Sequence, residues 1–231
     1  MDVTGLIQTI SIAALPILFA ITLHEAAHGY AARHFGDTTA WVAGRISLNP
    51  LRHVDPVGTL LVPALILAAS YFAADTALLF GWARPVPVNF RRLRDPRRDM
   101  IWVAAAGPAA NLLMALGWAA LLRLAMFLPD GAYTMPLGQM IVTGININLV
   151  LMVLNLLPLP PLDGGRIALG LLPYRLAVPF SRLERWGFPI LLLLLFVRVG
   201  DADNKASLLD LIMWPVIAMI KRLLLILFQL I

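Results

Sequence analysis

The sequence predicts an all-α polytopic membrane protein with about five to six transmembrane or re-entrant segments and a small β hairpin near the candidate site. Of its 231 residues, 60% are hydrophobic and 13% are charged, whereas soluble globular domains are about a quarter charged. Several apolar runs reach the roughly 20 residues that cross a bilayer. No polar region is long enough to bury a core of its own. We therefore expect one integral-membrane domain over residues 1–231.

The distribution of arginine predicts which loops face the cytoplasm. The net charge is +5, and arginines gather in residues 84–98 and again in residues 175–185. In a membrane protein such loops are first interpreted as cytoplasmic, and this setting argues against a nucleic-acid partner. The absence of cysteine excludes disulfides and thiolate metal ligands. The first residues, "MDVTGL", lack the basic region of a cleaved signal peptide, so we expect them to be retained.

The first expected element is a helix over residues 5–34, apolar up to Leu23 and polar after it. Residues 35–56 are rich in Gly, Pro, Asn and Asp. Within them the stretch at about 41–48 is β-like and bounded by turn residues, which predicts a short strand or hairpin. Residues 57–80 are apolar again, although they contain Pro63 and Asp75.

The remaining apolar runs give the other expected segments. Residues 100–128 and 139–160 are long enough to span, and the loop between them has no Lys or Arg. The positive-inside rule therefore predicts that residues 100–128 run from the cytoplasm outward and that residues 139–160 return. This places Asp163 near the cytoplasmic side. Hydrophobic segments at 186–199 and 207–231 follow. The last contains Lys221 and Arg222, so it either spans with snorkelling side chains or lies in the interface.

The segment "HEAAH" predicts a zinc site at the end of the first helix. His24 and His28 are four residues apart, so one helical face carries both imidazoles. Glu25 lies about 100° round the helix, where it can reach a metal-bound water and accept its proton as a general base. Catalytic zinc usually has three protein ligands and a water. Ionisable groups in a membrane segment are costly and indicate function, which favours a metal over incidental histidines.

Two residues compete to be the third ligand. His34 has the spacing of the soluble motif HExxHxxGxxH, but Ala31 stands where that motif needs the glycine that turns the chain back. A continuing helix would carry His34 past the metal. Asp163, in "PPLDGG", ends an apolar segment and is followed by two glycines. It is either a ligand or a turn aspartate, and spacing alone leaves this open.

Three motifs in order resemble a known family. They are HEAAH (residues 24–28), AGPAAN (106–111) and NLLPLPPLDGG (155–165). Together with "GRISLNPLRHVDPVGT" and "FGWARPVPVN", they resemble the site-2 protease family of intramembrane zinc metalloproteases over about residues 20–175. The chain looks like the short bacterial branch without PDZ or CBS domains.

The resemblance implies a function and a set of site residues. It implies that His24, His28 and Asp163 bind one Zn²⁺ and that Glu25 is the general base. Asn111 would stabilise the oxyanion, although a helix–helix hydrogen bond is an equal alternative for it. Asn155 would contact the substrate backbone. The expected substrates are transmembrane helices of other proteins, cleaved in the bacterial inner membrane.

The same ligand set has a consequence for topology. Since the three ligands must meet at one depth, the first helix should run from outside to inside, with the N-terminus outside. Residues 35–56 and 81–99 then share the cytoplasmic face, and residues 57–80 should be re-entrant or in-plane. A zinc transporter would need a polar path across the whole bilayer, but the polar residues gather at one end. A proteolytically inactive scaffold would have no use for Glu25.

Overall fold

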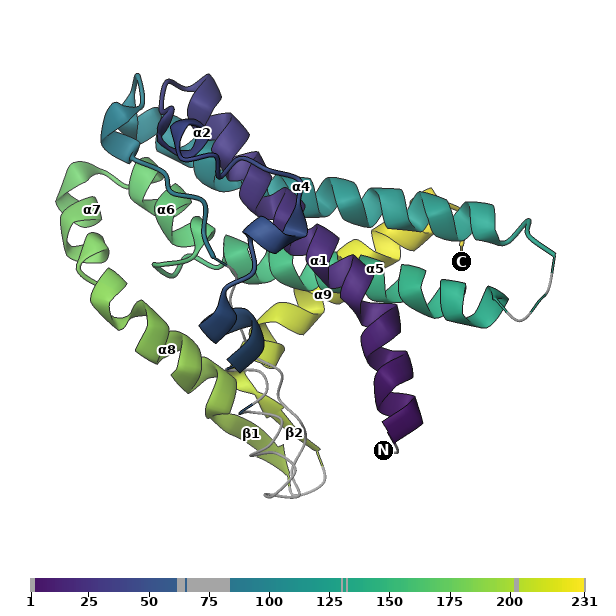
Figure 1. Cartoon of the computed structure of the whole chain (residues 1–231). Helices are drawn as coiled ribbons and strands as arrows, with labels where there is room; N and C mark the ends of the chain where they lie inside the picture. The colour runs from purple at the N-terminus through teal and green to yellow at the C-terminus, as the bar shows by residue number, and fades with distance from the viewer. Residues whose placement is uncertain are drawn as a thin grey trace.

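The computed structural model describes residues 3–61, 65, 84–129, 131, 133–201 and 204–230. Three of its helices pack side by side: α1 (Val3–His34), α4 (Pro96–Ala125) and α5 (Thr134–Leu156) (Figure 1). Each is long and apolar enough to cross a membrane. The expected all-α membrane architecture is thus confirmed in outline, but the described residues give three such spans, and the count of five to six is not confirmed.

Small side chains allow these helices to approach closely. α1 buries Ala20, Ala26 and Ala32 completely or nearly so, and α4 does the same with Ala115 and Ala119. Without water to drive helices together, close backbone packing of small residues is a main source of association inside a bilayer. The larger core residues come from α5 and from the C-terminal helix, and they include Ile141, Ile145, Leu149, Met213 and Ile217.

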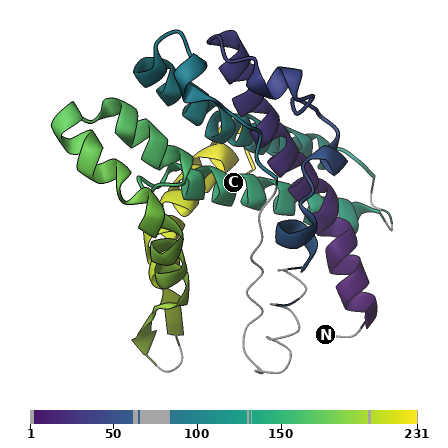
Figure 2. The ribbon, with the colours of Figure 1, turned by 60° about the vertical axis from the view of Figure 1, so that its left-hand side comes forward.

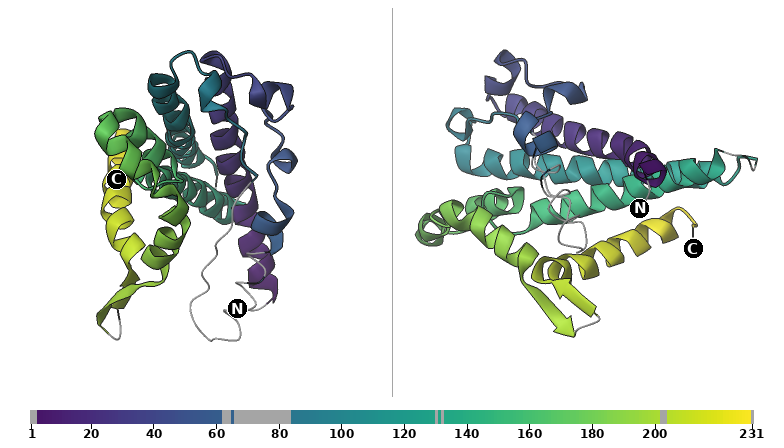
Figure 3. Two further views of the ribbon diagram at one scale, coloured as in Figure 1. Left: turned by 90° about the vertical axis from the view of Figure 1, so that its left-hand side faces the viewer. Right: turned by 60° about the horizontal axis from the view of Figure 1, so that its bottom comes forward.

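The C-terminal part of the chain, from residue 163 on, lies on one side of this bundle. A short helix, α6 (Asp163–Leu171), is followed by α7 (Tyr174–Ser181) and α8 (Glu184–Phe196), which form an arm leading away from the bundle (Figure 1). An antiparallel hairpin of β1 (Arg198–Asp201) and β2 (Asn204–Ser207) turns the chain, with Arg198 opposite Ser207. A capping box then starts α9 (Leu208–Leu227), which packs on α5 (Figure 3).

The predicted strand at residues 41–48 was wrong. Residues Thr39–Val42 form one helical turn, α2, and residues 43–48 are not part of a strand. The N–H of Arg45 donates to the Ala40 carbonyl and that of Gly44 to the Trp41 carbonyl, both at 2.9 Å. With Gly44 at φ +62°, this is a Schellman motif. Gly44, in the middle of the expected strand, therefore ends a helix. The small sheet is the hairpin of β1 and β2, and none of the described residues of these strands lines the cavity that holds the candidate site.

The loops that follow α1 and precede α4 lie against each other at one end of the bundle (Figure 2). The Arg94 N–H donates to the Phe35 carbonyl at 3.0 Å, and the Asn89 N–H donates to Asp37 Oδ2 at 2.6 Å. The chain therefore leaves α1 and enters α4 on the same face. The expected re-entrant segment at 57–80 lies mostly outside the described residues, which include only its first turn, η2 (Pro56–Leu61), and residue 65.

Asp37 is the buried anion that holds these two loops together. Burial alone would raise its pKa, but hydrogen bonds from the Thr39 hydroxyl and from the N–H groups of Thr39 and Asn89, with the nearby Arg92 charge, lower the pKa below its usual value. A lowered pKa contributes stability that is present above the unfolded pKa and is lost as pH falls through the folded pKa.

Asp37→Ala is therefore expected to destabilise the fold by about 1–3 kcal/mol at pH 7, because buried N–H donors lose their acceptor. Thermal unfolding in detergent measures this, with Thr38→Ala, at an exposed neighbouring position, as the control. The difference from wild type should begin to shrink below about pH 4, the usual pKa of an unfolded aspartate, and should disappear only below the lower pKa of folded Asp37. Equal stability of Asp37→Ala and wild type at pH 7 would contradict the role of this anion.

Candidate metal centre

Three side chains from two distant parts of the chain meet beside α4. His24 and His28 lie on one face of α1, with their Nε2 atoms 3.0 Å apart. Asp163, the first residue of α6, places Oδ2 3.3 Å from each Nε2 atom. Their ligand atoms form a group that could hold one metal ion. The structure thus brings together the ligand triad that the resemblance implied.

The chemistry of this cluster fits zinc. Zn²⁺ binds imidazole nitrogen and carboxylate oxygen at roughly 2.0–2.2 Å, which in a tetrahedral site separates the donor atoms by roughly 3.3–3.6 Å. The two distances of 3.3 Å from Asp163 match this separation, and the 3.0 Å between the Nε2 atoms is shorter. Asp163 Oδ2 is buried without a hydrogen-bond partner among the described atoms, and a buried acceptor of this kind calls for a cation or a donor. As metal ligands, Asp163 would bind as the carboxylate and the two histidines as neutral imidazoles.

Both imidazoles are oriented by a hydrogen bond on the side away from the cluster. His28 Nδ1 lies 2.7 Å from the carbonyl oxygen of Val103. Because a carbonyl only accepts, Nδ1 carries the proton and the Nε2 lone pair faces the centre. His24 Nδ1 lies 2.6 Å from Asn111 Oδ1 in the same way. Outer hydrogen bonds of this type fix the tautomer and the ring orientation of histidine ligands.

Asn111 lies behind His24 and does not line the cavity. Its Nδ2 donates to the Ala20 carbonyl at 3.3 Å and to Asn148 Oδ1 at 3.0 Å, so Oδ1 is left to accept from His24. The oxyanion role expected for Asn111 does not fit this geometry, because its N–H donors point to α1 and α5. The alternative helix–helix hydrogen bond is the one that forms. Asn148 completes this chain from α5, and its signal in the sequence was a polar residue within an apolar run.

Two glycines in the motifs mark close approaches of backbone to the centre. A Cβ on Gly107 of α4 would lie 2.4 Å from His28 Nε2 and 2.6 Å from His24 Nε2. A Cβ on Gly164, next to Asp163, would lie 2.3 Å from the carbonyl oxygens of Leu156 and Leu157. The first glycine leaves room for the imidazoles, and the second lets α6 start against the end of α5. The motifs AGPAAN and LDGG therefore have a packing explanation.

A cavity of about 240 Å³ opens beside the cluster and contains Glu25. Its lining includes the three clustered side chains, Glu25, Asn155 and part of the segment after residue 84. Glu25 Oε2 accepts from the Val86 N–H at 2.7 Å. Val86 stands between Pro85 and Pro87, which have no N–H, so it is the donor that this stretch offers. Asn155 donates one amide hydrogen to the Leu151 carbonyl.

The segment that holds Glu25 is itself held by Arg45. The Arg45 guanidinium donates to the carbonyls of Arg52, at 2.6 Å, and Arg84, at 3.1 Å. The Arg84 N–H donates to the His53 carbonyl at 2.9 Å. Sequence reasoning identified neither Arg45 nor Val86 as part of the site, because a backbone donor and a loop clamp leave no pattern in residue type.

His34 does not take part in the cluster. α1 continues through Ala31 and ends at His34, which is exposed and packs edge-on against Phe35 with ring centroids 5.1 Å apart. The expectation that a continuing helix carries His34 past the centre is confirmed, and Asp163 is the third member of the group.

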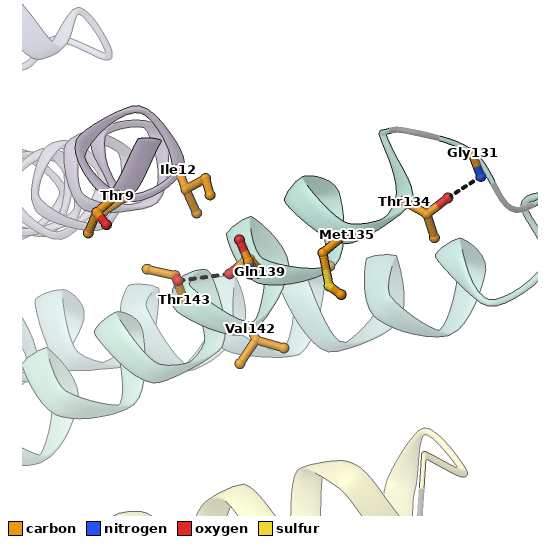
Figure 4. A pocket seen from close by; sticks show the side chains of 10 residues that line it. Thr9, Ile12, Gly131, Thr134, Met135, Gln139, Val142 and Thr143 are labelled. Carbon is orange, nitrogen blue, oxygen red and sulfur yellow. Dashed lines mark hydrogen bonds between the residues drawn. The ribbon is translucent and has the colours of Figure 1, made fainter. Parts of the chain in front are cut away.

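A larger cavity of about 880 Å³ lies between α1 and α5, near the N-terminal end of each (Figure 4). Thr9 and Ile12 face it from α1, and Gln139 and Thr143 from α5, where the Thr143 hydroxyl donates to the Gln139 carbonyl at 2.8 Å. None of the described residues that line it is ionisable. The smaller cavity, which contains His24, Glu25, His28 and Asp163, is therefore the candidate site.

Comparisons with known proteins agree with this chemistry. The chain is 37% identical over 206 residues to "Putative zinc metalloprotease YwhC" of Bacillus subtilis, covering 88% of this chain and 84% of that protein. It is 33% identical over 181 residues to "Putative zinc metalloprotease Rip2" of Mycolicibacterium smegmatis, covering 77% and 64%. No family model matches, and no solved structure matches.

These relatives and the long apolar helices identify a membrane-embedded metalloprotease with zinc as its cofactor. The chain belongs to the site-2 protease family of zinc metalloproteases.

Proposed function

We propose that the protein is an intramembrane zinc endopeptidase that cleaves peptide bonds within or next to transmembrane helices of other proteins. His24, His28 and Asp163 hold the ion, and Glu25 is the general base. One observation carries the proposal: a carboxylate, held by a backbone N–H, shares a cavity with three potential ligands, two of which lie on the membrane-spanning helix α1. The relatives' names support the protease class.

Each group at the site has a separate role in peptide hydrolysis. A bound zinc ion supplies Lewis-acid polarisation of water and of the peptide carbonyl. Glu25 takes a proton from the attacking water as the water oxygen bonds to the carbonyl carbon. It then passes this proton to the amine nitrogen as the C–N bond breaks. The Val86 N–H keeps Glu25 in place through both transfers. Asn155, which lines the cavity, holds the substrate backbone.

The substrate has to unwind before it is cut, because a helical peptide bond is shielded by its own hydrogen bonds and side chains. Residues 84–89 form neither helix nor strand, and Pro85, Val86 and Val88 line the cavity. The N–H groups of Arg84, Val86 and Asn89 are engaged and two residues of this segment are prolines. We therefore place the contacts with the unwound substrate main chain on the Val88 N–H and on the carbonyls that Arg45 does not use. This segment replaces the strand expected at residues 41–48, which does not form.

We further propose that the N-terminus lies outside a bacterial inner membrane and that the loops at 35–39 and 88–94 lie inside. The hydrogen bonds between these loops support a common side. Cysteines at Thr38 and Arg92, both exposed, should react with an impermeant maleimide in inverted vesicles and not in intact spheroplasts. Labelling of the two positions from opposite sides would overturn this arrangement.

Reconstituted protein tests the function directly. Liposomes containing the enzyme and a single-span substrate should show cleavage that stops with a zinc chelator and returns with added Zn²⁺. The products, identified by mass spectrometry, should end within or next to the span. Zinc accumulation in the vesicles without any cleavage would identify a transporter instead. Chelator-insensitive cleavage would exclude the metalloprotease mechanism.

A further inference from the structure

The cavity beside the metal cluster also contains a permanent cation. Arg166 of α6 lines this cavity together with Glu25 and Asp163. Asp163 and Arg166 are three residues apart, so they lie on one face of α6 with Cβ atoms about 5–6 Å apart. Among the described residues that line the cavity, Arg166 is the one lysine or arginine.

The surroundings of Arg166 orient its guanidinium and leave some of its N–H donors without a partner in the described part of the protein. The group lies over the ring of Phe90, which also lines the cavity, at 4.7 Å from the ring centroid. Its Nη2 lies 3.9 Å from Oε1 of Glu184, whose side chain is 57% exposed. A long, exposed ion pair of this kind contributes little. A guanidinium carries several N–H donors in a fixed fork, so donors remain for a molecule in the cavity.

The helix that carries Arg166 is fixed at both ends. Gly164 packs against the backbone at the end of α5. At the other end, Arg97 of α4 donates to the carbonyls of Gly170, at 3.0 Å, and Leu172. Rigid supports of this type hold a side chain in the position that a reacting group needs. The backbone of α6, and with it the starting points of the Asp163 and Arg166 side chains, is therefore fixed relative to α4 and α5.

The reaction needs a hydrogen-bond donor for the carbonyl oxygen, which becomes negatively charged. Most amide N–H groups of the asparagines at the site already donate to other groups. Attack on a peptide bond moves charge onto the carbonyl oxygen, and the nearby carboxylates of Glu25 and Asp163 disfavour that charge. Both Asn111 N–H groups are engaged with α1 and α5. Asn155 uses one N–H on the Leu151 carbonyl. A fixed cation in the same cavity is well suited to offset the developing charge.

Building on the proposed function, we propose that Arg166 is a catalytic residue that donates a hydrogen bond to the carbonyl oxygen of the scissile peptide bond. As the water oxygen bonds to the carbon and its proton moves to Glu25, the carbonyl π pair shifts onto this oxygen. When the C–N bond breaks, the pair re-forms the carbonyl and the Glu25 proton goes to the amine. Arg166 stays protonated throughout and exchanges no atom.

Arg166→Gln is the decisive variant, because it keeps a polar side chain and removes the charge. We expect kcat to fall about 10²–10³-fold, with KM and zinc content unchanged. Arg166→Lys should recover part of the loss. Arg175→Gln, the same change at an exposed arginine of α7, should behave as wild type.

Binding measurements separate a role in the reaction from a role in substrate affinity. In a Glu25→Gln background, adding Arg166→Gln should leave the affinity for an uncut substrate unchanged. In an otherwise wild-type enzyme, Arg166→Gln should weaken an anionic phosphinic peptide analogue by about the factor lost in kcat. The proposal is overturned if Arg166→Gln cleaves at the wild-type rate, if its loss lies only in KM and substrate affinity, or if it loses zinc. If wild type cleaves no peptide, the proposed function itself fails, and the role of Arg166 falls with it.

Discussion

Glu25→Gln is expected to lower kcat about 10²–10⁴-fold, the usual contribution of a general base, while zinc stays bound. Glutamine has the shape of glutamate, and its amide oxygen can still accept the Val86 N–H that now reaches Glu25 Oε2 at 2.7 Å. The amide cannot take a proton from water. Because Glu25 is not one of the clustered ligands, the ion should be unaffected. Cleavage rates and zinc content by mass spectrometry measure the two properties separately.

Glu184→Gln is a matched control, since Glu184 is the only other glutamate in the chain. It is exposed on α8 and does not line the cavity, and its 3.9 Å, solvent-exposed contact with Arg166 contributes little, so the same chemical change there should leave cleavage intact. Two outcomes would contradict the assignment. A Glu25→Gln enzyme that cleaves normally would require another base, and one that loses zinc would show that Glu25 acts through the metal.

Local geometry explains why much of the site could be predicted from the sequence. The pairing of His24 and His28 depends only on the pitch of a helix, and α1 supplies that helix over residues 3–34. The identity of the third member depends on tertiary structure, so spacing could not choose between His34 and Asp163. The resemblance chose Asp163, and the continuation of α1 through Ala31 gives the physical reason for excluding His34.

The features that the sequence did not predict are those that depend on hydrogen-bond partners. Gly44 lies within the stretch at about 41–48 that was expected to form a strand, but it ends α2 in a left-handed conformation. The resemblance implied an oxyanion role for Asn111, with a helix–helix hydrogen bond as an equal alternative. An amide can serve either role, and in the structure its N–H groups donate to α1 and α5. The hydrogen bond that positions Glu25 comes from the backbone N–H of Val86. Every residue except proline carries such a group, so the residue type gives no sign of it.

The position of Gly107 shows how α4 shapes the metal centre from a third helix. α4 contributes no ligand, yet it carries the carbonyl of Val103 that orients His28 and the amide of Asn111 that orients His24. These two hydrogen bonds hold both imidazole rings close to α4, so the residue of α4 that faces them between Val103 and Asn111 cannot carry a side chain. Gly107 is that residue, since a Cβ there would lie 2.4–2.6 Å from the Nε2 atoms.

Gly107→Ala is therefore expected to reduce zinc affinity by at least about 10–100-fold, the usual cost of disturbing the groups that orient metal ligands, and to reduce cleavage with it. The new methyl group would occupy the space beside the lone pairs that bind the ion, and rings fixed on their Nδ1 side cannot move away without breaking a buried hydrogen bond. Gly117→Ala is the matched control, because it lies in the same helix and its Cβ would meet no atom within 4 Å. Alanine has a higher helix propensity than glycine, so this control should fold and bind zinc as wild type does. Competition with a chromophoric chelator measures affinity, and circular dichroism checks that both variants are helical. Wild-type zinc affinity in helical Gly107→Ala would mean that the imidazoles do not need a glycine at this position of α4.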